Sequence, residues 1–379
     1  MGIPFLIPKE TMDRLSRPTG EGAACLLNAC YTDSGWLELE NECLFAQTWM
    51  FAGSIDNVPQ PGDVFPTTIG NKPVVLVHGR DGEIRAFHNV CRHRSAIVAE
   101  QACSNQSVLT CPYHAWAYGL GGKLRTHPHF NGADVHDVSR DGPGLVPIRL
   151  GLFHRTIFLN LDGKAAPFED YIAPLARRLS GHDLSALRLA KTLVWEVKAN
   201  WKLVFENYFE NYHIFAIHPR LDAFALMTSR QGFEFEDKLF HTEVAFGEPE
   251  GGRGVGLPYY PGLTPELERL EGGYHLFPSC CYQIWPDQLT VFQVLPVAPD
   301  HTIENLHVFM IGDAATDGAF GGARQGVYDM WDELNREDIN AIEWMQQGRY
   351  SPAFDGGILS GHWDPSHQHF AKLVVESMA

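Results

Sequence analysis

Two short cysteine–histidine pairs are the residues of this chain with the clearest chemistry. The first pair is Cys91 and His93, and the second is Cys111 and His114. Two thiolates and two neutral imidazoles suit a two-iron, two-sulfide cluster, because the thiolates can hold one iron and the imidazoles the other. Imidazole ligands also raise the reduction potential above that of an all-cysteine cluster. The spacing therefore predicts a [2Fe–2S] cluster held by these four side chains.

Zinc is the alternative metal, since two cysteines and two histidines are also a common zinc ligand set. Zinc ligands usually come as two closely spaced cysteines and two closely spaced histidines. Here each half supplies one Cys and one His. Residues 115–119 and 122–124, after the second pair, are similar to the same segment of Rieske proteins. These features favour a Rieske cluster over zinc.

A second candidate metal site lies at 201–218. The apolar pattern from 201 to 217 predicts one amphipathic helix that carries His213, and His218 follows it. Residues five apart lie about 140° apart around an ideal helix, but Pro219 disfavours helical backbone at His218 and should end the helix there. Two imidazoles and a carboxylate from another element would form the facial triad of a non-haem Fe(II) oxygenase. Taken alone, such a pair is more typical of histidines in the core or on the surface.

The two constellations together resemble the oxygenase α subunits of the Rieske non-haem iron family over almost the whole chain. The matching residues are the four cluster ligands, residues 200–202, Glu206, Asn207 and the pattern Glu210-x-x-His213-x4-His218. The resemblance implies that His213 and His218 bind mononuclear Fe(II) with an aspartate from a late helix. Asp338 matches that aspartate, and Glu337 and Glu343 are the competing carboxylates.

Glu210 occupies the position where the family carries a carboxylate three residues before the first iron histidine. The resemblance implies that this carboxylate links His213 to a Rieske histidine of the neighbouring subunit, and it groups Asn207 with Glu210 as catalytic. Most members have Asp at this position, so Glu210 is a departure. It resembles the subgroup that acts on quaternary ammonium compounds, such as the carnitine and glycine betaine monooxygenases.

The resemblance implies a terminal oxygenase component that activates O2 and hydroxylates or oxidatively demethylates a small organic substrate, best matched by a quaternary ammonium or N-methyl compound. It further implies a homotrimer, in which electrons pass between subunits, and a separate flavin or iron–sulfur reductase that draws on NADH. The sequence has no Gly-x-Gly-x-x-Gly fingerprint after a strand. One alternative substrate is an aromatic or other small organic acid. The alternative of another class is a Rieske electron carrier without an oxygenase site.

The elements that must position these residues fall into an α+β arrangement. We expect an N-terminal arm and helix over 1–44, an all-β Rieske domain over 45–165 and a catalytic domain over 166–379. The resemblance implies that helices cover a curved antiparallel sheet in the last of these. A chain of 379 residues exceeds the usual size of one core, which agrees with more than one domain.

Periodicity and turn signals predict the individual elements. We expect helices near 36–48, capped by Asp33 and Ser34, within 168–187, at 201–217, near 323–347 and after His367. Strands are expected within 51–165, at 189–197, 274–285, 289–296 and 303–311. The stretch 228–273 has no clear period and is expected to be a mobile excursion. Aromatic residues on the late strands are candidates for a pocket lining: Tyr274, Tyr282, Trp285, Phe292 and Phe309.

The net charge and the cysteines indicate which binding partners and which cellular compartment to expect. The net charge of -17 argues against nucleic acid, because phosphate contacts need clustered Lys and Arg. The six cysteines outside the cluster motif do not form a small disulfide framework and are expected to be inert thiols. Neither a signal peptide nor a membrane span is apparent. We therefore expect a cytoplasmic protein with no membrane partner.

Overall fold

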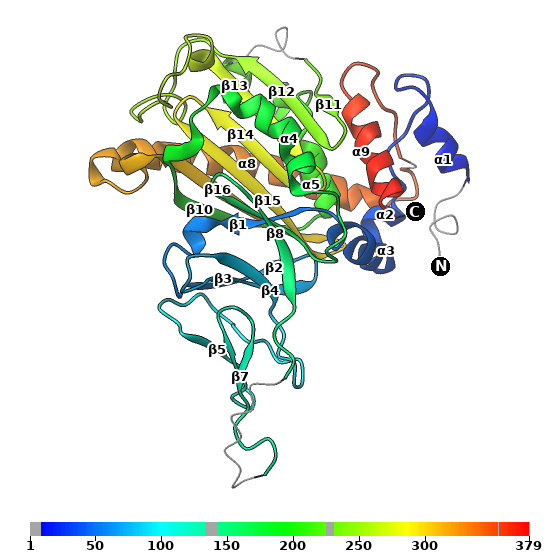
Figure 1. Cartoon of the computed structure of the whole chain (residues 1–379). Coiled ribbons are helices and arrows are strands. Elements are labelled where there is room, and N and C mark those ends of the chain that lie inside the picture. Colours follow the sequence, from blue (N-terminus) through cyan, green and yellow to red (C-terminus); the bar gives the residue numbers. More distant parts are fainter. Residues whose placement is uncertain (1–8, 133–141, 225–230, 355, 379) are drawn as a thin grey trace. The chain divides into compact units, whose positions relative to one another are not determined.

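The structure is a computed structural model that describes residues 9–132, 142–224, 231–354 and 356–378 (Figure 1). It divides into two compact units, which are Met1–Leu44 with Ala166–Ala379 and Phe45–Ala165. The N-terminal arm therefore packs with the C-terminal part of the chain, although residues 1–8 lie outside the described ranges. Helices and antiparallel strands share the first unit and strands dominate the second, so the α+β class is confirmed.

The unit Phe45–Ala165 contains two antiparallel sheets. The larger sheet has the order β1-β9-β8-β4-β3-β2, and the smaller has the order β5-β6-β7. The strands of this unit are β1 (Met50–Ser54), β2 (Val64–Ile69), β3 (Lys72–His78), β4 (Ile84–His88), β5 (Val108–Thr110), β6 (Ala117–Gly119), β7 (Leu124–Thr126), β8 (Pro147–Phe153) and β9 (Thr156–Asn160). The expected all-β module is confirmed.

A hydrophobic cluster joins the two sheets of this unit. Val75 and Val77 alternate inward from β3, and they share the cluster with Trp116 and Leu124 from the segment around the smaller sheet. Alternation with a period of two places these β-branched side chains on one face of the strand. Cys91 and Cys111 belong to the same cluster, so both sulfurs are buried before any metal is considered.

The larger unit is built on a seven-stranded antiparallel sheet with the order β10-β16-β15-β14-β13-β12-β11. Its strands are β10 (Leu187–Val197), β11 (Glu234–Glu236), β12 (Leu239–Ala245), β13 (Leu270–Leu276), β14 (Cys280–Trp285), β15 (Gln288–Ala298) and β16 (His301–Ile311). Its α-helices are α1 (Lys9–Ser16), α2 (Ala29–Thr32), α3 (Ser34–Leu39), α4 (Phe168–Arg178), α5 (Trp201–Tyr208), α6 (Ile214–Ile217), α7 (Pro219–Phe224), α8 (Gly321–Arg349) and α9 (Pro365–Glu376). Helices α5 and α8 contact each other, and α9 lies beside α1 (Figure 1).

The predicted single helix over 201–217 is wrong. Helix α5 ends at Tyr208, and α6 begins only at Ile214. Phe209 is fully buried and stacks on Phe240 of β12, with their ring centroids 4.8 Å apart. The Glu210 carboxylate accepts the backbone N–H of His213 at 3.1 Å and also that of Tyr212. A side chain that takes these backbone donors competes with helix continuation, so the chain breaks before the histidines.

The predicted excursion over 228–273 is also wrong in part, because β11, β12 and the start of β13 fall within it. Residues 228–230 lie outside the described ranges. Gly272 and Gly273 hide the alternation of β13 in the sequence, and a Cβ at Gly272 would lie 2.6 Å from the Tyr274 ring. The predicted strand 274–285 is in fact two strands, β13 and β14, paired as a hairpin.

The expected N-terminal helix is shorter in its α-helical part than predicted. Helix α3 starts at Ser34, and the Asp33 side chain accepts the Trp36 N–H at 3.0 Å, which confirms the cap. From Glu40 to Phe45 the chain continues as a π-helix rather than as α-helix. Such wider turns are rare and often mark functional sites. Here the change of winding starts at Glu40, a residue with no exposed side-chain surface.

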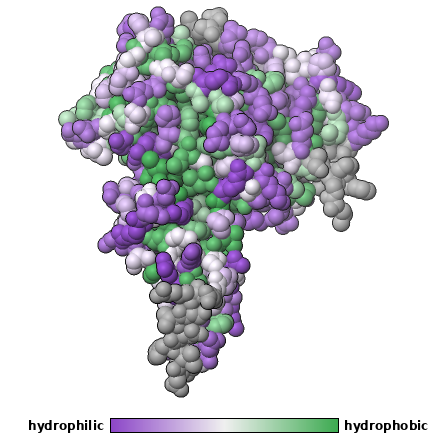
Figure 2. Space-filling view, in the orientation of Figure 1, coloured by the Kyte–Doolittle hydropathy of each residue, from purple (hydrophilic) through white to green (hydrophobic). Residues whose placement is uncertain are grey.

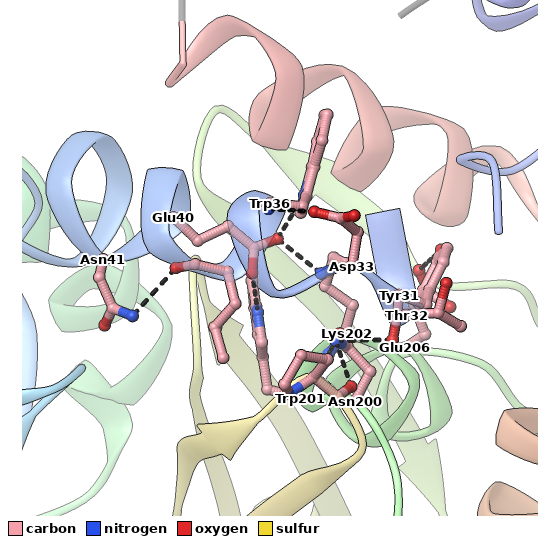
Figure 3. Close-up of polar contacts among 12 residues, drawn as sticks. Tyr31, Thr32, Asp33, Trp36, Glu40, Asn41, Asn200, Trp201, Lys202 and Glu206 are labelled. Atoms are coloured by element: carbon pink, nitrogen blue, oxygen red, sulfur yellow. Dashed lines mark hydrogen bonds and ion pairs between the residues drawn. The ribbon is translucent and has the colours of Figure 1, made fainter. Parts of the chain in front are cut away.

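Glu40 lies in a buried polar cluster with the start of α5 (Figure 3). Its carboxylate accepts from Lys202 Nζ at 2.5 Å, Trp36 Nε1 at 2.8 Å and Trp201 Nε1 at 2.7 Å. Burial raises the pKa of Glu40, whereas Lys202 and the two indoles oppose that rise. Beside this cluster, the Tyr31 hydroxyl donates to Glu206 at 2.6 Å. These contacts fix the N-terminal segment to the first two turns of α5.

Hydrophilic and apolar residues are interspersed over the visible face of the molecule (Figure 2). Among the described residues, no helix is both long and apolar enough to cross a membrane.

Replacing Lys202 with Met should lower the free energy of unfolding by about 3–5 kcal/mol, because it leaves the Glu40 carboxylate buried without its cation. Urea unfolding followed by tryptophan fluorescence measures this loss. The control is Arg336→Met, which removes the partner of Asp332 from an exposed ion pair and should change the unfolding free energy far less. Equal losses for the two variants would contradict a stabilising role for the buried pair.

Candidate functional site

The cluster ligands of the sequence motif lie on two loops with matching backbone geometry. Cys91 N–H donates to Ala96 C=O at 2.8 Å, and Cys111 N–H donates to Trp116 C=O at 2.8 Å. In each loop the residue four positions after the cysteine donates back to the cysteine carbonyl and has a positive φ, 58° at Ser95 and 56° at Ala115. The two turns therefore present their Cys-His pairs in similar ways.

The two cysteines are buried, and the two histidines each offer a buried ring nitrogen to a metal. The Nδ1 atoms of His93 and His114 are buried and have no hydrogen-bond partner among the described residues, and the two ring centroids are 4.6 Å apart. Burial alone raises the pKa of the Cys91 thiol, but hydrogen bonds from Tyr118 Oη, 3.3 Å away, and from nearby backbone N–H groups lower it overall. A lowered thiol pKa favours the thiolate that binds metal. This donor set fits a cluster with two sulfur and two nitrogen ligands.

The structure brings His213, His218 and Asp338 together, and their candidate ligand atoms lie within 4.8 Å of one another. Asp338 Oδ1 is 2.9 Å from His218 Nε2 and 3.4 Å from His213 Nε2. His213 immediately precedes α6, His218 immediately follows it, and Asp338 lies on α8. Three ligand atoms that point at one place fit a facial triad, which leaves the other side of a metal open.

Electrostatics in the triad favour an ionised carboxylate beside charged imidazoles when no metal is bound. Burial lowers the pKa of His213, but hydrogen bonds with Asp338 and Glu210 outweigh it and raise that pKa to about 10. Burial would raise the pKa of Asp338, but the two histidines outweigh burial and hold that pKa well below its usual range. A metal must displace the histidine protons, so its binding is coupled to proton release.

Glu337 and Glu343 occupy different places from the triad. Glu337 Oε2 lies 2.7 Å from His218 Nδ1, on the side of the ring away from Asp338. A carboxylate at the outer nitrogen orients a histidine ligand and fixes which nitrogen faces the metal. Glu343 Oε1 accepts from the Lys198 backbone N–H at 3.0 Å. Of the three candidate carboxylates, Asp338 is therefore the one that lies with both histidines at the possible metal position.

Glu210 lies against the outer nitrogen of His213. Its Oε1 atom contacts His213 Nδ1, while its other oxygen accepts the His213 N–H. Burial raises the pKa of Glu210, but these contacts with His213 lower it overall. Glu210 and Asn207 both line the cavity beside the triad. His213 and His218 thus each have one carboxylate at Nδ1 and share Asp338 near Nε2.

The cavity beside the triad has a volume of about 930 Å³, including the space at its mouth. Its walls come mainly from α5, α6, α7, α8, β12, β13 and β14, from the segment between α5 and α6, and from the loop between β12 and β13. The lining residues are Asn207, Tyr208, Glu210, Asn211, His213, Ile214, His218, Leu221, Phe233, Thr242, Val244, Phe246, Arg253, Glu271, Gly273, Gln283, Trp285, Met330, Trp331, Leu334 and Asp338.

Only one of the five aromatic residues expected in the lining is found there. Trp285 lines the cavity, whereas Tyr274, Tyr282, Phe292 and Phe309 are buried elsewhere. The sequence pattern missed Glu271 and Arg253, which also line the cavity. Both belong to the region expected to be a mobile excursion. If the sequence had indicated strand β13, positions 271, 273 and 275 would have been expected on one side of it. Glu271 would then have been a candidate for the same face as Gly273, which also lines the cavity.

Two family models match separate segments that together cover about three quarters of the chain. Residues 184–379 match the ring hydroxylating alpha subunit (catalytic domain), and residues 48–137 match the Rieske [2Fe-2S] domain. The carnitine monooxygenase oxygenase subunit of Escherichia coli (strain K12) is 28% identical, with 91% of each chain covered. The glycine betaine monooxygenase oxygenase subunit of Pseudomonas aeruginosa (strain UCBPP-PA14) is 27% identical and covers 92% of this chain and 87% of its own.

Solved structures share the fold. A quaternary ammonium Rieske monooxygenase has a TM-score of 0.80 at 23% identity, covering 94% of this chain and 96% of its own. Naphthalene 1,2-dioxygenase from Rhodococcus sp. has a TM-score of 0.73 at 19% identity, with 98% of each chain covered. The catalytic-domain match spans more than half of the chain, and a match to the Rieske domain precedes it in the sequence. The chain therefore belongs to the ring-hydroxylating α subunits, which are Rieske-type oxygenases with a [2Fe–2S] cluster and a mononuclear iron.

Proposed function

We propose that this oxygenase acts on a small quaternary ammonium or N-methyl compound, which it hydroxylates or oxidatively demethylates. The observation that carries the proposal is the cavity, in which aromatic rings accompany a carboxylate that belongs neither to the metal triad nor to the pair lying against its histidines. That carboxylate is Glu271 on β13. The names of the carnitine and glycine betaine monooxygenase relatives support the same class of substrate.

The cavity has the features that attract an organic cation. Phe246 and Trp285 pack with their ring centroids 5.3 Å apart, and Trp331 lies in the wall contributed by α8. Aromatic faces attract a cation most strongly where water is excluded. Burial raises the pKa of Glu271 to about 8, with Arg253 opposing that rise. A cation bound nearby would favour the ionised form of Glu271 and would gain its charge as a partner.

We assign the two cofactors to the ligand sets described above. Cys91, His93, Cys111 and His114 would hold the [2Fe–2S] cluster, and His213, His218 and Asp338 would hold the iron. When bound, the iron supplies the site at which O2 is reduced. Glu337 would then orient His218 through Nδ1, as Glu210 orients His213. The cavity wall beside the triad would place the substrate next to the open side of the metal.

Glu210 has a proposed role beyond orientation. A carboxylate that accepts from His213 Nδ1 can also accept from a histidine of a neighbouring subunit, which we infer to be the counterpart of His114. Such a bridge would couple the cluster of one subunit to the iron of the next within a head-to-tail homotrimer. One structural relative is described as giving insights into inter-subunit electron transfer. Asn207, one turn earlier on α5, would orient substrate or water through its amide.

Electrons must come from outside this chain, since it carries no dinucleotide-binding fingerprint. We propose a separate flavin or iron–sulfur reductase that takes them from NADH. The catalytic-domain match excludes the alternative of a Rieske electron carrier that lacks an oxygenase domain.

A small aromatic acid is a second candidate substrate, because Arg253 lines the cavity with only 1% of its surface exposed. A guanidinium can bind a carboxylate through two parallel hydrogen bonds. The large oxygenase component of salicylate 5-hydroxylase from Ralstonia sp. is 28% identical, covering 62% of this chain and 59% of its own. Product analysis with a reconstituted reductase and a panel of amines and aromatic acids separates the two candidates.

Removing any one side chain of the triad should remove the mononuclear iron and leave the cluster. In His213→Ala, His218→Ala and Asp338→Ala, iron content should fall from about three to about two atoms per chain, because each residue is one of only three protein ligands. Metal analysis and the cluster's absorption spectrum measure the two centres separately. Glu343→Ala is the matched control and should keep both. Full iron and activity in Asp338→Ala would move the assignment to Glu337.

Replacing Glu271 with Gln should raise KM for a trimethylammonium substrate about tenfold or more, since the cation loses its counter-charge in a water-poor cavity. Affinity for the neutral analogue with carbon in place of nitrogen should hardly change. Substrate binding and turnover across that pair of compounds provide the measurement. Glu234→Gln is the control, because Glu234 belongs to the same sheet but is exposed on β11 and does not line the cavity. Equal effects on both compounds would contradict cation recognition by Glu271.

Glu210→Gln should keep both metal centres but slow electron transfer between them by orders of magnitude. The amide retains the size of Glu210 and loses the charge and one acceptor position. Stopped-flow spectra should show a reduced cluster that persists in the presence of substrate and oxygen. Mixing a cluster-deficient variant with an iron-deficient variant should restore some activity if the route crosses between subunits. Wild-type turnover by Glu210→Gln would leave Glu210 with an orienting role only.

A further inference from the structure

The buried side chains of Glu304 and Asn335 and the half-buried side chain of Tyr208 close a ring of contacts at the cavity wall. Tyr208 Oη lies 2.7 Å from Glu304 Oε1 and 2.7 Å from Asn335 Oδ1, and Asn335 Nδ2 lies 3.1 Å from Glu304 Oε2. Glu304 is on β16 and has no exposed surface, and Asn335 is 2% exposed on α8. Tyr208 is the last residue of α5 and also lines the cavity.

Counting protons in this ring gives the ionisation state of Glu304. Asn335 Nδ2 can donate to Glu304, and the single hydroxyl proton of Tyr208 can serve one of the other two contacts. The remaining contact then needs a proton on Glu304. Exchanging the oxygen and nitrogen of the Asn335 amide does not change the result, because the amide oxygen then faces the Glu304 carboxyl group. Every contact is satisfied only when Glu304 is a carboxylic acid.

The surroundings of Glu304 also disfavour a charge. The titratable groups that interact with it are Tyr208 from α5, Asp338 from α8 and Cys281 from β14. Among the described residues, none of these three groups is a cation. Burial, together with the Asp338 charge, raises the pKa of Glu304 to about 7, although its hydrogen bonds with Tyr208 and Asn335 oppose the rise.

We propose that Glu304 is held as a neutral carboxylic acid and that it supplies a proton to the oxygenase cavity through the hydroxyl of Tyr208. The demand for protons follows from the reaction class: R–H, O2, two electrons and two protons give R–OH and water. A cavity that excludes water around its substrate needs an internal donor for such a step. Tyr208 connects the buried acid to that cavity.

The transfer balances within the ring. The Tyr208 O–H bond breaks as its proton leaves toward the cavity, and the Glu304 O–H bond breaks as its proton passes to the Tyr208 oxygen. Glu304 is left as a carboxylate that accepts from Tyr208 and Asn335. After the product leaves, water re-enters and the reverse transfer restores the acid. Glu304 thus supplies one of the two protons in each turnover.

Glu304→Gln tests the ionisation state without relying on turnover. The amide can make all three ring contacts, so the variant should fold and keep its iron. Infrared difference spectra of wild type should show the carbonyl band of a protonated carboxylic acid that is missing in the variant. The melting temperature of the variant relative to wild type should also rise with pH from about 4.5 to about 7. Wild type loses stability in that window because its unfolded chain releases the Glu304 proton before the folded chain does.

Single-turnover product formation tests the relay, with pre-reduced enzyme and a substrate that wild type converts. At saturating substrate, Glu304→Gln and Tyr208→Phe should each lower the rate about a hundredfold, and the double variant should be no slower than either. Tyr171→Phe is the matched control, because its hydroxyl donates to the Phe277 carbonyl and does not line the cavity. Unchanged rates in both variants would overturn the relay.

Absence of the acid band in wild type would overturn the neutral acid and the relay together. If wild type converts no quaternary ammonium compound in the panel, the proposed substrate fails, while the infrared result still decides the state of Glu304.

Discussion

The unit formed by Met1–Leu44 and Ala166–Ala379 depends on the buried ion pair between Glu40 and Lys202. Two charged side chains without exposed surface are stable only if they pair with each other and if further hydrogen-bond donors contact the carboxylate. The indoles of Trp36 and Trp201 provide those donors to Glu40. Because Glu40 and Lys202 are 162 residues apart in the sequence, the pair fixes where α5 begins relative to the N-terminal segment. Every later residue of that helix, including those at the cavity, takes its position from there.

The site itself is organised by a balance of charge. Asp338 is ionised and buried, and in the metal-free protein it is stabilised by His213 and His218. Glu210 and Glu337 lie against the outer nitrogens of the same two rings. A bound metal cation would replace the histidine protons and keep these carboxylates compensated. A further charged carboxylate at Glu304 would have no such compensation, which agrees with the proton demanded by its ring of contacts.

The wall of the cavity is formed both by paired strands and by a loop. Thr242, Gly273 and Gln283 come from neighbouring strands whose register is fixed by backbone hydrogen bonds, and Gly273 pairs with both of the others. The loop that carries Arg253 lies outside this strand pairing and is held in part by side chains, for example by Gln288, which donates to the Gly252 carbonyl at 2.9 Å. The strands therefore determine the shape of the wall, whereas the loop can differ between relatives that take different substrates.

The candidate ligand types, a Rieske part followed by a catalytic part, and the long helix that carries Asp338 could be predicted from the sequence, because these depend on local spacing and hydrophobic periodicity. The sequence did not determine the break after Tyr208, since that break depends on Phe209 packing against β12 and on Glu210 capturing backbone donors. Nor could it find Glu271 or the proton on Glu304. Those features arise from contacts between residues far apart in the chain, and only the tertiary structure brings such groups within hydrogen-bonding distance.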